Sequence, residues 1–204
     1  MLLELDDSQL VLVDYQTRLM PAISEGATVL ANASRLAQMA RLLKVPLFAT
    51  EENPTGLGPT MPELQALIAQ AGGKTLAKMQ FSAVADGLAA LLRPPARVPQ
   101  GNARSLPKHL QKPAKAAVER NSVVIAGCEA HVCLLQTALD LLDDEFDVWV
   151  VTDACASRSE RNRDAAFDRL AGAGAELVTT EMVAFEWLRT AEHPAFEEVL
   201  KLVK

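Results

Sequence analysis

The sequence predicts a doubly wound α/β domain, in which a parallel sheet is covered by helices on both faces. Short apolar runs alternate along the chain with longer segments whose apolar residues recur at helical spacing. One run, Val123 to Ala126, is continuously apolar, which is typical of a parallel strand buried on both faces. Half of the 204 residues are hydrophobic, which suffices for one full-sized core. We therefore expect a single domain over residues 1–204.

The first half of the chain predicts three strands and three helices. The strands are expected at Leu10 to Val13, Val45 to Thr50 and Thr75 to Met79. A long amphipathic helix between the first two strands has on one face Val29, Ala33, Leu36, Ala40 and Leu43. Thr60 and Glu63 have the spacing of a capping box for a second helix, which ends before Gly72. The segment from Ser82 to Leu92 is helical by composition.

The segment from Arg93 to Val118 differs in composition from its surroundings. It holds five of the eleven prolines, six lysines or arginines, one histidine and no acidic residue. We interpret this Pro-rich, basic insertion as a loop or lid over the domain. The alternative is a solvated insertion whose charge balances an acidic body.

The stretch from Asn121 to Leu142 contains the candidate nucleophile. Its apolar strand is followed by the turn GCEAHVC and then by a helix whose apolar face is Leu135, Ala138, Leu139 and Leu142. Thr137 is assigned to the polar face of that helix. Cys133 falls near the first turn of the helix, where free N–H groups and the helix dipole favour an anion such as a thiolate. A buried structural cysteine is the alternative.

The remainder of the chain predicts two strands and three helices. The strands are expected at Val148 to Thr152 and Glu176 to Thr180. Ser157 and Glu160 predict a cap for the helix between them, which ends near Gly172. Two short helices close the chain, and the last has on one face Phe196, Val199, Leu200 and Val203.

Three polar residues lie at or just beyond the carboxyl end of a predicted strand or its turn. They are Asp14, Lys78 and Cys133. Ligands of doubly wound folds bind beyond these strand ends, so one crevice could gather all three side chains. Helix capping by Asp14 and a surface position for Lys78 are the alternatives at this point.

Charge and cysteine content exclude several classes of function. A net charge of -6 argues against nucleic acid as a partner, since phosphate binding needs concentrated basic residues. The segment after the first strand, YQTRLMP, lacks the glycines of a dinucleotide site, and we expect no cofactor. Three cysteines without CxxC spacing, an acidic start and no long apolar run predict a cytoplasmic protein without a membrane partner.

Five blocks, in order, resemble the isochorismatase-like cysteine hydrolases, and the match is nearest to the isochorismatase-domain-containing and YcaC-like proteins. The blocks are VLVDYQ, TEENPTGLG, KMQFSA, AGCEAHVCLLQTALDLL and VVTDACASRS, and they span nearly the whole chain. The resemblance implies a six-stranded parallel sheet in the order 3-2-1-4-5-6. It also implies a catalytic triad of Asp14, Lys78 and Cys133, with Lys78 stabilising both the carboxylate and the thiolate.

The resemblance further implies how such a site would act. A non-proline cis peptide between Cys128 and Glu129 would aim the N–H groups of Glu129 and Cys133 at one point, forming an oxyanion hole. The substrate would be a small amide, ureide or related acyl compound, cleaved through a thioester. Substrate contacts are expected from Leu19, Glu52, Leu57 and His131. Family members assemble as dimers, tetramers or larger rings, so we expect a homo-oligomer.

The sequence departs from the nicotinamidase-like members, which bind a metal through an Asp-x-His and a second histidine. The corresponding stretch here is Glu51, Glu52 and Asn53, so we expect no metal. Two other functions remain open. One is a non-catalytic member of the fold that binds a small ligand or a protein. The other is a thiol redox protein that uses Cys128 and Cys133.

Overall fold

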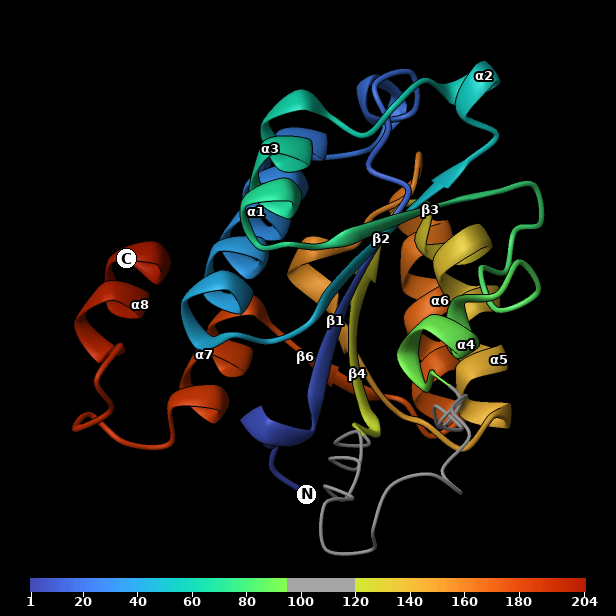
Figure 1. The fold of residues 1–204 in the computed structure, drawn as a ribbon. Coiled ribbons are helices and arrows are strands. Elements are labelled where there is room, and N and C mark those ends of the chain that lie inside the picture. Colours follow the sequence, from blue (N-terminus) through green and yellow to red (C-terminus); the bar gives the residue numbers. More distant parts are fainter. Residues whose placement is uncertain (95–119) are drawn as a thin grey trace, which may run out of the picture.

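A computed structural model describes residues 1–94 and 120–204, and it has the predicted three-layer α/β fold (Figure 1). The strands are β1 (Ser8–Val13), β2 (Leu47–Glu52), β3 (Lys74–Lys78), β4 (Ser122–Gly127), β5 (Asp147–Val151) and β6 (Glu176–Val178). All neighbouring strands are parallel, and their order is β3-β2-β1-β4-β5-β6. This confirms the order that the family resemblance implies.

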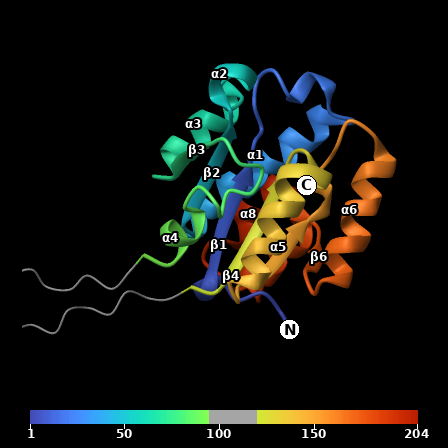
Figure 2. The same ribbon diagram turned by 90° about the vertical axis from the view of Figure 1, so that its right-hand side faces the viewer.

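Helices cover both faces of the sheet (Figures 1 and 2). One face carries α1 (Gly26–Leu43), α3 (Pro62–Gln70), α7 (Thr180–Leu188) and α8 (Phe196–Val203). The other face carries α4 (Leu88–Leu92), α5 (Leu135–Asp143) and α6 (Glu160–Gly172). A single turn, α2 (Pro54–Leu57), follows β2. In the part of the chain that the structure describes, no helix combines the length and apolarity needed to cross a membrane.

Strands β1 and β4 form the centre of the sheet, and every residue of both is buried. Their register pairs Val13 with Gly127. A Cβ atom at Gly127 would lie 2.4 Å from the carbonyl oxygen of Val13, so only glycine allows this approach. At the other end of the pair, the Asp7 carboxylate accepts hydrogen bonds from the N–H groups of Asn121 and Ser122. The two strands are therefore held together at both ends.

Two predicted helix caps are wrong. Helix α3 is preceded by Met61, and Thr60 instead donates from its N–H and hydroxyl to Glu51, at 2.7 and 2.8 Å. Helix α6 is capped by Ser159, whose hydroxyl accepts from the Asn162 N–H, while Ser157 is fully buried. In both cases a tertiary contact takes the residue that the local pattern assigned to the cap.

The helix predicted for Ser82 to Leu92 is restricted to α4, because its first half binds to α5. The N–H of Ala83 donates to the hydroxyl of Thr137, and the Ser82 hydroxyl donates to Asp140. Thr137 is consequently buried, although its place in the sequence assigned it to the polar face of its helix. Tertiary contacts with the neighbouring helix α5 thus override local helix propensity here.

The predicted insertion of residues 93–118 falls largely outside the described residues, which exclude 95–119. Its interpretation as a lid therefore stays a prediction. Its first residue, Arg93, is attached to the domain. The guanidinium donates to the carbonyl oxygens of Asp144 and Glu145 and lies 3.6 Å from the centre of the Phe146 ring.

Candidate active site

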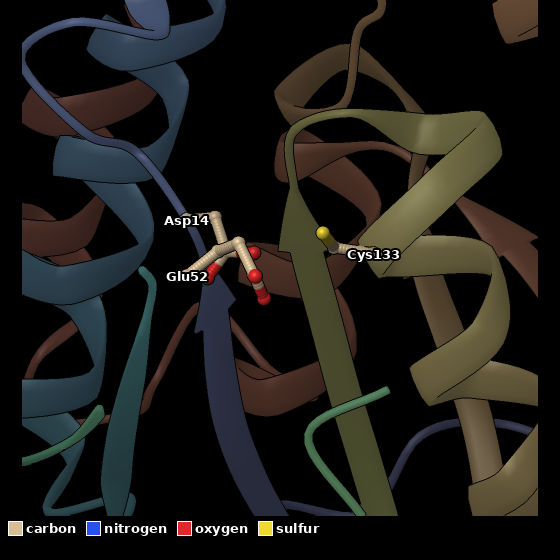
Figure 3. Close-up of side chains that lie close together, drawn as sticks. All are labelled: Asp14, Glu52 and Cys133. Carbon is tan, nitrogen blue, oxygen red and sulfur yellow. The ribbon is translucent and has the colours of Figure 1, made fainter. Parts of the chain in front are cut away.

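Four side chains meet at the carboxyl ends of the central strands, and Figure 3 shows three of them, Asp14, Glu52 and Cys133. Asp14 follows β1 directly, Glu52 and Lys78 are the last residues of β2 and β3, and Cys133 lies in the turn after β4. Figure 3 shows the carboxylates of Asp14 and Glu52 on one side and the Cys133 sulfur facing them. The structure thus brings together the three residues that the sequence singled out and adds Glu52 to them.

Lys78 binds both carboxylates. Its Nζ lies 2.8 Å from Oδ2 of Asp14 and 2.8 Å from Oε2 of Glu52. The same ammonium donates to the carbonyl oxygens of Gln80 and Phe81, at 3.3 and 3.2 Å. Burial lowers the pKa of Lys78, but the two carboxylates outweigh burial and leave the pKa raised above its usual value. Lys78 is therefore a fixed positive charge, and the alternative of a surface ammonium is excluded.

Asp14 is fully buried, and both of its carboxylate oxygens are engaged. Oδ1 accepts a 2.6 Å hydrogen bond from the hydroxyl of Thr50, and Oδ2 forms the ion pair with Lys78. The backbone of Asp14 has a φ of 55°, a left-handed conformation that Asp and Asn tolerate better than most residues. Asp14 is thus oriented toward Lys78 and Cys133 rather than used as a helix cap.

Cys133 is buried opposite these groups, with 6% of its surface exposed. It lies in a π-helical turn, Ala130–Leu134, which leads into α5. One oxygen of Asp14, one oxygen of Glu52 and the Cys133 sulfur lie within 4.8 Å of one another. The sulfur therefore lies close to a possible proton acceptor.

The thiol of Cys133 is protonated at neutral pH. Burial raises its pKa most, and Asp14 raises it further, while Lys78 lowers it by less than Asp14 raises it. The expectation that the helix terminus and Lys78 would favour a resting thiolate is therefore wrong. The two carboxylates and the burial of the thiol raise its pKa by more than the one ammonium lowers it.

The turn between β4 and Cys133 contains the non-proline cis peptide that the resemblance implies, between Cys128 and Glu129. The Glu129 carboxylate accepts from the Arg158 N–H at 2.9 Å and from its Nε at 3.0 Å. The next N–H, of Ala130, donates to Ala156. In residues 1–94 and 120–204, the backbone N–H of Glu129 donates to no acceptor. This N–H is free to bind a ligand.

The predicted substrate contacts occupy different surroundings. Nδ1 of His131 lies 2.9 Å from the Ser157 hydroxyl, and Nε2 lies 3.2 Å from the Asn162 amide, so both ring nitrogens have partners toward α6. Leu19 is half-buried in the segment after β1, and Leu57 is half-buried at the end of α2. The Arg18 N–H donates to the carbonyl oxygen of Leu57 and joins the two segments. Glu52, by contrast, belongs to the charged cluster of Asp14, Glu52 and Lys78.

Cys128 and Cys155 are buried, reduced thiols. Burial is the main cause that raises the pKa of Cys128 to about 12 and that of Cys155 well above its usual value. Both thiols are therefore inert by protonation state and by access.

Asp14, Glu52 and Cys133 also offer three atoms of the kind that bind metal ions. Lys78 lies 2.8 Å from both carboxylates and already supplies a positive charge at this position. A cation at this position would have to displace the Lys78 ammonium.

Two residues that shape the site were missed by sequence reasoning. Thr50 binds Asp14, and it could have been identified because it ends the predicted second strand, next to the strand that ends at Asp14. Asp86 accepts from the N–H groups of Met79 and Gln80, at 2.9 and 3.0 Å, and so fixes the turn whose carbonyls bind Lys78. No local pattern identifies that contact.

Comparison with known proteins places this geometry in a family context. The Isochorismatase domain model matches residues 108–182. The chain is 37% identical over 199 residues to isochorismatase domain-containing protein 2A of Mus musculus, covering 98% of this chain and 84% of that protein. Among solved structures, the MAR1 ribonuclease of Caenorhabditis elegans aligns with a TM-score of 0.84 and 30% identity, covering 100% and 92% of the two chains. The YcaC gene product of Escherichia coli, described as an octameric hydrolase of unknown specificity, aligns with a TM-score of 0.77 and 26% identity, covering 98% and 95%.

Proposed function

The chain belongs to the isochorismatase-like hydrolase family, and from this premise we propose that it hydrolyses a small amide, ureide or related acyl compound through a thioester on Cys133. The observation that carries the proposal is the position of the Cys133 sulfur, which lies within 4.8 Å of a carboxylate oxygen of Asp14. Asp14 is itself held by Thr50 and Lys78. A nucleophile, a base and a group that orients the base are the parts that acyl transfer by a cysteine requires.

The first chemical step joins proton transfer to attack. Because the resting thiol is protonated, its proton passes to Asp14 as the sulfur attacks the carbonyl carbon of the substrate. The C=O bond becomes a C–O⁻ bond, and the N–H groups of Glu129 and Cys133 stabilise this oxyanion. Lys78 keeps Asp14 in place and offsets the negative charge of the cluster.

The second half of the reaction releases the two products. The tetrahedral intermediate expels ammonia or an amine, which takes the proton from Asp14 and leaves a thioester. Asp14 then accepts a proton from water, which attacks the thioester carbon and releases the acid. The Cys133 sulfur recovers its proton, so the cycle consumes only water. We propose that it proceeds without a metal, because Lys78 supplies the local positive charge.

A small substrate fits the site better than a nucleic acid. The C. elegans structural neighbour is described as a ribonuclease. In this chain the net charge is -6, and the site holds two carboxylates beside one ammonium. Negative charge at the reacting centre opposes the approach of phosphates.

A homo-oligomer is part of the proposal. The E. coli neighbour is described as an octamer. The described residues expose several large apolar side chains, among them Met79, Phe81, Met182 and Phe185. Two of them, Met182 and Phe185, are three residues apart on α7, and adjacent exposed apolar side chains of this size support an association surface there.

Trapping the acyl-enzyme tests the proposed function. The protein is mixed with amide and ureide libraries, quenched in acid, and its intact mass is measured. We expect an added acyl mass on the wild type and none on Cys133→Ala, which has no nucleophilic side chain at this position. The control variant Cys155→Ala removes a buried thiol away from the crevice and should still be acylated. An adduct that persists on Cys133→Ala would contradict the assignment of the nucleophile. Activity that is lost with a chelator and restored by a metal would contradict the metal-free mechanism.

A further inference from the structure

We infer that Glu52 selects substrates by charge: it favours molecules that carry N–H donors or a positive charge beside the attacked carbonyl and rejects those with a carboxylate there. This inference rests on the proposed function, because it takes Cys133 as the reacting group. It narrows the proposed substrates to those with a particular charge beside the attacked carbonyl.

Glu52 is the carboxylate of the cluster whose unused acceptor a ligand can reach. Oδ1 of Asp14 accepts from Thr50, and Oδ2 forms the ion pair with Lys78, but Oδ2 accepts no hydrogen bond from the described residues and is buried. One oxygen of Glu52, Oε2, binds Lys78. Within residues 1–94 and 120–204, the other oxygen, Oε1, accepts no hydrogen bond. The Glu52 side chain is 10% exposed, whereas those of Asp14 and Lys78 are 0% exposed. Glu52 therefore offers an arriving ligand a charged acceptor beside the Cys133 sulfur.

The formal charge of the cluster is negative. Two carboxylates and one ammonium leave one negative charge, and the Cys133 thiol is neutral. Two acids that neighbour the cluster in the sequence or in the active-site turn do not compensate this charge. Glu129 is paired with Arg158, and Glu51 accepts its hydrogen bonds from Thr60. A buried excess charge of this kind is costly unless a donor or an opposite charge reaches it.

Catalysis leaves this net charge unchanged but moves it toward the substrate. As the thiol proton passes to Asp14, negative charge moves from that carboxylate to the Cys133 sulfur, within 4.8 Å of an oxygen of Glu52, and then to the substrate oxygen. A ligand N–H on Oε1 of Glu52, or a positive charge nearby, favours that change, and a ligand carboxylate opposes it. The geometry therefore fits ureides and amides that carry a free NH₂ or an ammonium group, such as an amino-substituted primary amide. It disfavours acyl compounds with an acidic substituent.

Thiol reagents of opposite charge test the inference without any turnover. Cys133 is labelled with 2-aminoethyl methanethiosulfonate, a cation, and with 2-sulfonatoethyl methanethiosulfonate, an anion. In each case the sulfur attacks the sulfenyl sulfur, an S–S bond forms, methanesulfinate leaves, and the thiol proton passes to solvent. Rates at Cys133 come from peptide mapping after timed quenching, and each is divided by the rate of the same reagent with glutathione.

We expect the normalised rate of the cation to exceed that of the anion by about tenfold or more, because both reagents have similar size and differ in charge. Glu52→Gln, which keeps the shape and removes the charge, should reduce the ratio to about threefold or less. Glu52→Asp keeps the charge and should retain most of the preference. The matched control is Glu51→Gln, which changes the net charge equally at the preceding residue and should leave the ratio unchanged.

Each outcome of the experiment has a distinct meaning. Equal rates for the two reagents on the wild type would overturn charge selection while leaving Cys133 as the nucleophile. If the preference for the cation survives in Glu52→Gln, or falls equally in Glu51→Gln, Glu52 is not the residue that selects by charge. If neither reagent labels Cys133, the proposed function fails together with the inference. Should Glu52→Gln not fold, as judged by circular dichroism, the wild-type ratio and Glu52→Asp decide the question.

Discussion

The hydroxyl of Thr50 donates a 2.6 Å hydrogen bond to Oδ1 of Asp14, the carboxylate oxygen that Lys78 does not hold. Thr50→Val keeps the shape of the side chain and leaves that oxygen without a donor. We expect a loss of about 1 to 2 kcal/mol in the free energy of unfolding and a fall of about tenfold in turnover. Thr50→Ser keeps the hydroxyl and should stay near wild type in turnover. Equal turnover in the two variants would show that Asp14 needs no second anchor.

The pH dependence of Cys133 alkylation should change when Asp14 loses its charge. Asn is the substitution to use, because the φ of 55° disfavours alanine. In the wild type the pKa of the thiol is raised, so the iodoacetamide rate at neutral pH should be slow and should climb through the alkaline range. Asp14→Asn removes one cause of the raised pKa, so its curve should shift to lower pH while turnover is lost. A curve that shifts to higher pH would contradict the assigned electrostatics.

Asp86 should position Lys78 through the turn between them. Asp86→Ala removes the acceptor for the N–H groups of Met79 and Gln80, so the carbonyls that bind Lys78 lose their support. We expect turnover to fall about tenfold. Asp86→Asn keeps an acceptor oxygen and should recover most of the activity. The pH curve of Cys133 alkylation gives a second readout, since displacement of Lys78 raises the thiol pKa. Identical curves in wild type and Asp86→Ala would exclude this positioning.

Gly127 should not tolerate a methyl group. Gly127→Ala places a Cβ 2.4 Å from the Val13 carbonyl oxygen, between the two central strands. We expect a loss of about 3 kcal/mol or more in the free energy of unfolding, measured by urea titration. The control is Gly172→Ala at the end of α6, where nothing lies within 4 Å, and this variant should be neutral or slightly stabilised. Similar midpoints for the two variants would contradict the close approach of β1 and β4.

Stability should decline at alkaline pH because buried thiols must ionise on unfolding. The folded pKa of Cys128 is about 12, above the usual value, so its contribution is full below about pH 8.5 and is lost as pH rises toward 12. The expected slope for this thiol is about 1.4 kcal/mol per pH unit in that window. In Cys128→Ala, the free energy of unfolding should fall less steeply with pH between pH 8.5 and 10, whatever its value at neutral pH. An unchanged slope would contradict the prediction.

Much of the fold was predictable because strand and helix periodicities repeat over long segments. The positions of Asp14 and Lys78 followed from the rule that ligands bind beyond strand ends, and the family resemblance supplied the strand order. The protonation state of Cys133 was not predictable. It depends on how many carboxylates approach the sulfur, and Glu52 comes from a strand that no local pattern connects to Cys133.

The wrong predictions concern side chains that form hydrogen bonds with another element instead of with their own segment. Thr60 and Ser157 have the spacing of helix caps, but each binds a residue of another element, Glu51 and His131 respectively. Thr137 falls on the polar face of its helix by periodicity, yet it binds the backbone of Ala83. Tertiary hydrogen bonds decide these positions, and each joins the residue to a different element of the fold.

The Asn121 N–H donates a hydrogen bond to the carboxylate of Asp7, 114 positions earlier in the chain, and this long separation affects when activity appears during folding. Asp14 and Lys78 come from the first half of the chain and Cys133 from the second, so neither half contains the reacting groups together. Closing so long an interval is entropically costly, and we expect β1 and β4 to pair late. A refolding chain can therefore regain most of its helical signal while it is still chemically inert. Recovery of charge-selective labelling at Cys133 would time the moment at which the two halves join.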